Sequence, residues 1–121
     1  MKAASHNIEA MLLTTYGFEM QVLEPVLNTG FPLFVVNRDE TPKGSVNRNY
    51  YGFKNFTHIS PPKTMSGYGV YHIKLWLIKF KHFLRVVVCT SNQHLMDWAM
   101  WQNSYWFHDC PLQTTSDPEP R

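Results

Sequence analysis

Two strand-length apolar runs dominate the second half of the chain. Residues 73–80 and 84–89 are rich in branched and aromatic side chains, which are enriched in strands. The basic pair Lys81-His82 interrupts the apolar pattern between them and predicts a solvated turn. Because this connection is so short, we expect the two runs to pair with each other as an antiparallel hairpin.

The first third of the chain changes from a strand pattern to a helix pattern and back. Residues 10–18 suit a strand, and residues 19–27 place apolar side chains at helical spacing until Gly30 ends the helix. Pro25 weakens the last turn of that helix. Residues 31–37 are a continuous apolar run, which is typical of a buried parallel strand. The order strand, helix, strand predicts the crossover unit of an α/β sheet.

The other segments complete one folded unit. They are a polar loop with one short helix at most (38–54), a strand (56–60), a helix (95–102) and a last strand (104–108). The chain therefore divides into an N-terminal tail (1–9), one domain (10–112) and a flexible polar tail (113–121). The predicted fold class is α/β, with a mixed or parallel sheet flanked by helices.

Composition agrees with a single folded domain. The chain has 121 residues, of which 44% are hydrophobic and 15% aromatic, so it can bury a modest core. The net charge of +2 is too small to establish a nucleic-acid partner. Basic side chains do gather in and around the predicted hairpin, at Lys74, Lys79, Lys81 and Arg85.

Neither a metal site nor a membrane segment is expected. Cys89 and Cys110 lack C-x-x-C spacing, which predicts free thiols in a reducing compartment. Four histidines do not fall at metal-ligand spacing with each other or with the cysteines, namely His58, His82, His94 and His108. No apolar run reaches eighteen residues, and the N-terminus lacks the apolar core of a signal peptide. We therefore expect a soluble intracellular protein that uses no metal or other cofactor and binds no membrane.

The candidate chemistry lies at one end of the predicted hairpin. His72 and Lys74 are two residues apart, so on a strand their side chains face the same way. Asn92 follows the second strand and would lie beside them if the two strands pair directly. An imidazole nucleophile beside a fixed cation and an amide is the arrangement that attack on a phosphodiester needs.

Two of these three residues also have a structural explanation. A lone histidine such as His72 is more often a structural residue, and Asn92 could cap the helix that follows it. Lys74 is harder to explain as a solvated side chain, because its neighbours Ile73 and Leu75 fit a buried strand. The three residues together, at this spacing, favour a catalytic site.

The segment around these residues resembles the first catalytic motif of the tyrosyl-DNA phosphodiesterases, a family of the phospholipase D superfamily. The similarity lies in H-x-K at His72, an asparagine eighteen residues after Lys74, the surrounding LRVVVCTSN and the following Asp97-Trp98. It extends over residues 11–112. Other branches of the superfamily carry an aspartate and a Gly-Ser pair that are missing here. The resemblance implies a phospholipase D-like half-domain, which is an α-β-α sandwich.

The resemblance also implies a mechanism. His72 would attack phosphorus at the 3′ end of a single-stranded or frayed DNA strand and expel a tyrosine or another blocking group, leaving a phosphohistidine. Lys74 and Asn92 would hold the non-bridging oxygens as charge develops. The nearby lysine favours the neutral imidazole that attack requires. No divalent ion is needed when fixed side chains supply the charge.

Further substrate contacts are assigned around this motif. Tyr68 lies four residues before His72, where the resembling family carries an aromatic residue near its site. Ser91 precedes Asn92 and is expected as a cap, turn or substrate contact rather than as a nucleophile. Asn103 stands where the family tends to carry a glutamine, which is one methylene longer. The family implies DNA repair in the nucleus, by exonuclease-like removal of 3′ blocks.

The resemblance leaves the site incomplete. Enzymes of this family use two H-x-K motifs, one from each half, and the second histidine serves as acid and then as base. This sequence has a single H-x-K, at His72. The chain would then be a piece of a longer enzyme, or pair with a second half-domain or a copy of itself, or be a remnant. A remnant would bind nucleic acid or protein without catalysis, and we expect an isolated monomer to be inactive. A lipid phosphodiesterase is a weaker alternative, because no amphipathic membrane-binding helix is evident.

Overall fold

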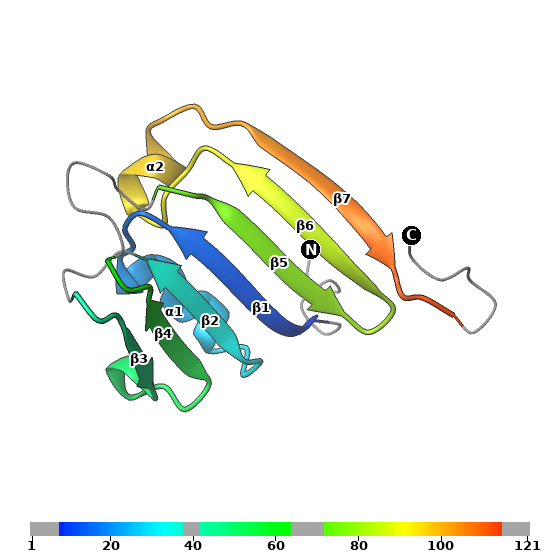
Figure 1. Cartoon of the computed structure of the whole chain (residues 1–121). Coiled ribbons are helices and arrows are strands. Elements are labelled where there is room, and N and C mark those ends of the chain that lie inside the picture. Colours follow the sequence, from blue (N-terminus) through cyan, green and yellow to red (C-terminus); the bar gives the residue numbers. More distant parts are fainter. Residues whose placement is uncertain (1–7, 38–41, 64–71, 115–121) are drawn as a thin grey trace.

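The structure is a computed structural model that describes residues 8–37, 42–63 and 72–114 (Figure 1). Its strands are β1 (Ile8–Thr15), β2 (Leu33–Asn37), β3 (Ser45–Arg48), β4 (Phe56–Ser60), β5 (Leu75–Phe80), β6 (Phe83–Cys89) and β7 (Tyr105–Pro111). Its helices are α1 (Met20–Leu27) and α2 (Leu95–Ala99), with a 3₁₀ turn, η2 (Tyr50–Gly52). The predicted α/β class with a mixed sheet is confirmed.

The strands form one sheet in the order β3-β4-β2-β1-β5-β6-β7, with a parallel half and an antiparallel half. β1, β2 and β4 are parallel, whereas β5, β6 and β7 form an antiparallel meander whose first strand runs antiparallel to β1. The C-terminal ends of β1, β2, β4 and β6 therefore share one edge with the start of β5 and of β7. We call it the polar edge, after its buried polar residues Thr15, Asn37, Ser60, Lys74 and Ser91.

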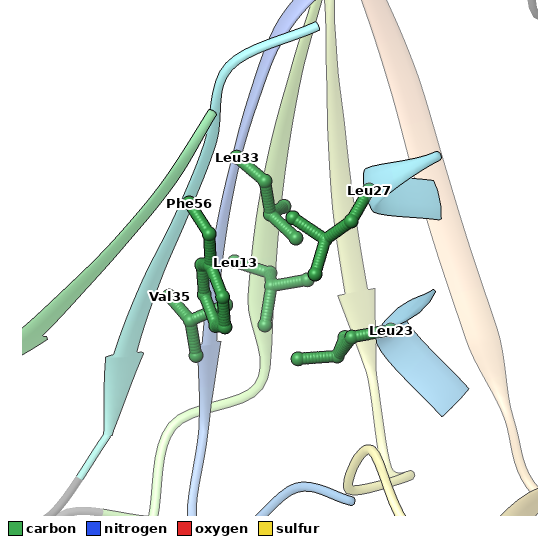
Figure 2. Packing of buried hydrophobic residues seen from close by; sticks show 6 residues of the cluster. All are labelled: Leu13, Leu23, Leu27, Leu33, Val35 and Phe56. Carbon is green, nitrogen blue, oxygen red and sulfur yellow. The ribbon is translucent and has the colours of Figure 1, made fainter. Parts of the chain in front are cut away.

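Helix α1 covers one face of the sheet and forms the core with it. Alternate residues of a strand point to the same face, and residues four apart on a helix share one side. The side chains that meet here are Leu13, Leu33, Val35 and Phe56 from the strands and Leu23 and Leu27 from α1 (Figure 2). None of the six is more than 2% exposed. Full burial of side chains of this size contributes about 1.5–3 kcal/mol each.

Helix α1 keeps its last turn although it contains Pro25. Proline removes only one helical hydrogen bond, the one its own N–H would donate. The Asn28 N–H still donates to the Glu24 carbonyl at 2.9 Å. Gly30 then turns the chain at φ +92°, a conformation that favours glycine, and its N–H donates to the Leu27 carbonyl at 3.1 Å. The helix end predicted at this glycine is confirmed.

The segment predicted as a loop with one short helix contains strand β3 as well as η2. The loop prediction is wrong for residues 45–48, whose sequence SVNR has no apolar run. β3 lies at the edge of the sheet, so half of its side chains are exposed. It forms because it pairs antiparallel with β4, with Asn47 opposite His58. The neighbouring strand, rather than the local pattern, makes this segment a strand.

The sheet face opposite α1 carries no helix in the described ranges (Figure 1). On β6 and β7 this face presents Val88 and Trp106, which are 49% and 58% exposed. The core is therefore one-sided, between α1 and a single sheet face. Among the described helices, none has both the length and the apolar character to cross a membrane.

Shortening a side chain in this core should lower the free energy of unfolding. Leu13→Ala removes a side chain that is 2% exposed beneath α1, and we expect it to lower the free energy of unfolding by about 3 kcal/mol. Val46→Ala on β3, where the side chain is 61% exposed, is the matched control and should change it by less than about 0.5 kcal/mol. Urea unfolding followed by circular dichroism measures both. Equal losses in the two variants would contradict this core.

Candidate functional site

The candidate site lies at the polar edge, between the start of β5 and the end of β6. The segment 72–74 leads directly into β5, and Asn92 follows the end of β6 by three residues. β5 and β6 pair antiparallel, with Leu75 opposite Val88, so the start of one strand and the end of the other are neighbours. In open α/β sheets, ligands bind at the carboxyl ends of the strands, which is the position of this site.

His72 and Lys74 contact each other. The Lys74 ammonium bonds the ring nitrogen Nδ1 of His72, lies 3.4 Å from Nε2 and donates to the His72 carbonyl at 3.2 Å. The imidazole is exposed, and the ring of Tyr16, at the end of β1, packs against it with centroids 4.9 Å apart and tilted by 31°. His72 is thus exposed to solvent, whereas Lys74, which contacts its ring, is buried.

Lys74 is a buried cation that pairs with no anion in the described part of the chain. The residue is 8% exposed, and no carboxylate of the described residues lies within ion-pair distance of its ammonium. Burial lowers the pKa of the Lys74 ammonium, because the charged form loses solvation. The negative charges of Asp97 and, when ionised, Cys89 act in the opposite direction. Burial in turn raises the pKa of the Cys89 thiol, which fits a free cysteine in the core.

Asn92 is held at the site by its backbone. Its N–H donates to the Asp97 carboxylate at 2.6 Å. Its side-chain oxygen Oδ1 is buried and has no hydrogen-bond partner among the described residues. Helix α2 begins after His94, which occupies the cap position, so Asn92 does not cap it. In the described part of the chain, no hydrogen bond explains the position of this oxygen, and no contact joins the Asn92 side chain to His72 or Lys74.

Two further residues assigned to substrate support the turn after β6. Ser91 is fully buried, and its hydroxyl lies 3.0 Å from the Tyr105 hydroxyl. The Asn103 amide donates to the Asp97 carbonyl at 2.5 Å, and its oxygen accepts from the Thr90 hydroxyl at 3.0 Å. Both side chains thus hold protein groups in place. Contacts of Ser91 and Asn103 with substrate stay a prediction.

Tyr68, the other predicted substrate contact, lies outside the described residues.

Glu19 supports the site and was not identified from the sequence. Its carboxylate accepts from the Leu95 N–H at 3.0 Å and lies 3.4 Å from the His94 ring, and the first of these contacts lowers the pKa of Glu19. The Glu19 N–H also donates to the Gln93 carbonyl at 2.8 Å. A Cβ at Gly17 would come within 2.5 Å of His94 Nε2, so a larger residue there would require the His94 ring to move. The loop after β1 is thereby fastened to the turn that carries Asn92.

An aromatic cluster borders the site on the β6–β7 side. The rings of Trp76, Trp98 and Tyr105 lie with centroids 5.8 to 6.0 Å apart. Trp98 and Tyr105 are 46% and 45% exposed, so part of the cluster faces solvent. The described residues include no group of three or more His, Cys, Asp or Glu side chains that could hold a metal ion.

Comparisons with known proteins show the family and the fold. A sequence model of the family described as tyrosyl-DNA phosphodiesterase matches residues 3–120. The fold is similar to the crystal structure of a mutant yeast tyrosyl-DNA phosphodiesterase, with a TM-score of 0.60 and 12% sequence identity. The similarity covers 84% of this chain and 24% of the yeast chain, so this chain spans about a quarter of that protein. A comparison with curated protein sequences gave no match.

The surroundings of Lys74 predict the effect of a charge substitution. Asp97→Asn keeps an oxygen that can accept from the Asn92 N–H but removes the negative charge that favours the ammonium. We expect the pKa of Lys74 to fall further below its ordinary value. A ¹³C titration of the lysine ε-carbon measures this directly.

Asp109→Asn is the matched control. Asp109 pairs with Arg85 on β6 and does not contribute to the charge around Lys74, so the lysine titration should not change. A rise in the pKa of Lys74 in Asp97→Asn, or equal shifts in both variants, would refute this description of the lysine environment.

Proposed function

The chain belongs to the tyrosyl-DNA phosphodiesterase family, and we propose that it acts on the phosphodiester at blocked 3′ ends of DNA through His72. The observation that carries this proposal is the buried Lys74 ammonium, which contacts an exposed His72 and has no carboxylate within ion-pair distance among the described residues. A cation held away from water without a counter-ion is costly, and binding of an anion would offset that cost. A DNA phosphodiester supplies such an anion, next to the nucleophile.

The contact between the two side chains suggests how His72 is prepared. An ammonium group donates hydrogen bonds and cannot accept them. In this contact the nitrogen Nδ1 is therefore the hydrogen-bond acceptor. When a phosphodiester binds, its non-bridging oxygens compete with His72 Nδ1 for the Lys74 ammonium. The ammonium then donates its hydrogen bond to a phosphate oxygen instead of to the histidine nitrogen. This exchange frees a lone pair beside phosphorus and brings a positive charge to the equatorial oxygens in the same step.

Asn92 is proposed as the second group on the phosphoryl oxygens. Its backbone is fixed by Asp97, while the buried oxygen of its carboxamide has no partner in the described residues. A carboxamide that is not held by other protein groups is free to turn its NH₂ toward a ligand. In the proposed reaction a bond forms between the His72 ring nitrogen and phosphorus. The bond from phosphorus to the blocking group breaks, and the leaving oxygen takes the electron pair.

The second step of the reaction needs a further group. A tyrosyl oxygen leaves well only if an acid protonates it, and release of the phosphohistidine requires a base for water. The sequence has a single H-x-K, so we propose that a second half-domain or a second copy of this chain provides that residue. DNA repair in the nucleus, with single-stranded or frayed 3′ ends as substrate, is part of the same proposal.

The single H-x-K also favours a second candidate function. In this alternative the chain is a remnant that binds nucleic acid or protein without catalysis. Such a module would bind DNA with an affinity that falls with salt. Its binding would not depend on His72.

An activated substrate separates these candidates. The probe is an oligonucleotide carrying a 3′-p-nitrophenyl phosphate, whose phenolate leaves without protonation. We expect one equivalent of nitrophenolate per site and a stoichiometric DNA adduct on His72, detected by intact-protein mass spectrometry at neutral pH. A 3′-phosphotyrosyl oligonucleotide should give about 10²-fold less adduct or none, because no acid assists its leaving group.

The controls are two histidine substitutions. His72→Ala should abolish the adduct, whereas His82→Ala, in the exposed turn between β5 and β6, should leave it unchanged. Salt-dependent DNA binding that survives His72→Ala, with no adduct in the unmodified protein, would establish the remnant instead.

A further inference from the structure

The backbone pairing of β1 with β5 ends immediately before the site. Its register stops at Leu13. Thr14, the next residue, continues the connection with its side chain. Its hydroxyl accepts from the Leu75 N–H at 2.8 Å and donates to the Ile73 carbonyl at 2.9 Å. The two peptide groups that it bonds lie on either side of Lys74.

The hydroxyl of Thr14 replaces the backbone N–H and C=O groups that an adjacent strand would supply. In a regular antiparallel ladder, one N–H and one C=O of the adjacent strand would satisfy these groups. A hydroxyl has one donor and two acceptor positions, so a single side chain can replace both. Thr14 is 6% exposed, and water has little access to this point. Without the hydroxyl, the Leu75 N–H and the Ile73 carbonyl would lack their partner, which is costly in a buried place.

The Lys74 peptide is held from the other side as well. Its carbonyl accepts from the Cys89 N–H of β6 at 3.2 Å. The backbone around the lysine is thus fixed between two strands at the point where the sheet ends. One of these two attachments is an ordinary backbone bond, and the other depends on a single side chain.

We propose that Thr14 is a positioning residue, which fixes the segment 73–75 so that the Lys74 ammonium meets the His72 ring. The effect of Thr14 on catalysis rests on the function proposed above, whereas its effect on the position of the Lys74 ammonium does not. Thr14 touches neither the imidazole nor the ammonium and acts only through the backbone on each side of the lysine. The desolvation that lowers the pKa of Lys74 is consistent with a side chain held in one buried position.

The neighbouring Thr15 offers a matched control. It is fully buried, and its hydroxyl donates to the Gly17 carbonyl at 2.7 Å, within its own turn. Thr14→Val and Thr15→Val each remove one buried hydroxyl and keep the shape of the side chain. Only the first removes a bond to β5. Thr14→Ser keeps the hydroxyl and should retain the contact between His72 and Lys74 that Thr14→Val loses.

The test measures the geometry first. In the unmodified protein we expect nuclear Overhauser contacts between the His72 ring protons and the Lys74 ε-methylene. They should disappear in Thr14→Val and persist in Thr14→Ser and Thr15→Val. With the nitrophenyl oligonucleotide, Thr14→Val should form the adduct about 10²-fold more slowly, as expected for a misplacement of about 1 Å. Persistence of the contacts in a folded Thr14→Val variant would overturn the proposal.

Hydrogen exchange in the unmodified protein tests the same bond without a substitution. The Leu75 amide should exchange about as slowly as the amides of the paired part of β5, because Thr14 protects it. Exchange at the rate of an exposed amide would overturn the proposal even if Thr14→Val does not fold. The two hypotheses fail separately. Absence of adduct in the unmodified protein refutes the enzymatic function, whereas the Overhauser and exchange results decide the role of Thr14.

Discussion

The cost of burying one ammonium group governs this structure. A charged lysine away from water is unfavourable unless ligands compensate it. Among the described residues, the Lys74 ammonium has hydrogen bonds to the ring and the carbonyl of His72 alone. Its position is maintained because the strands on both sides hold its backbone. The attachment from β1 passes through the hydroxyl of Thr14, and the attachment from β6 is a backbone bond. In the function proposed above, an anionic substrate would compensate the charge of this ammonium.

The two halves of the sheet contribute differently to this arrangement. The parallel strands β1, β2 and β4 pack against α1 and supply most of the buried core, so they form the rigid part. The meander β5–β6–β7 carries the residues of the site at one end. Glu19 joins the two parts, because its carboxylate binds the Leu95 N–H and its backbone binds Gln93. Rigid strands thereby position side chains that lie in irregular segments just beyond them.

Much of the fold could be predicted from local patterns. The hairpin of β5 and β6 follows from two apolar runs and a polar break. The contact between His72 and Lys74 does not follow from the alternation of strand side chains, because β5 begins at Leu75 and both residues precede it. The pairing of β3 could not be predicted, because its sequence is polar and its structure depends on β4. The supporting roles of Thr14 and Glu19 were also hidden, since each bonds a segment about sixty to seventy-five residues away in the chain. Such contacts require the strand order, which a single sequence does not reveal. A threonine at a strand end and an acidic residue before a helix are common features, so neither indicates a supporting role by itself.

The claim that His72, Lys74 and Asn92 form one phosphoryl-binding site can be tested directly with orthovanadate, which adopts the geometry of phosphoryl transfer. A crystal structure of the vanadate complex should show vanadium bonded to the His72 ring nitrogen. The Lys74 ammonium and the Asn92 amide should each lie within hydrogen-bond distance of its equatorial oxygens. A structure in which vanadate does not bind, or in which the Asn92 side chain points away from it, would contradict the account.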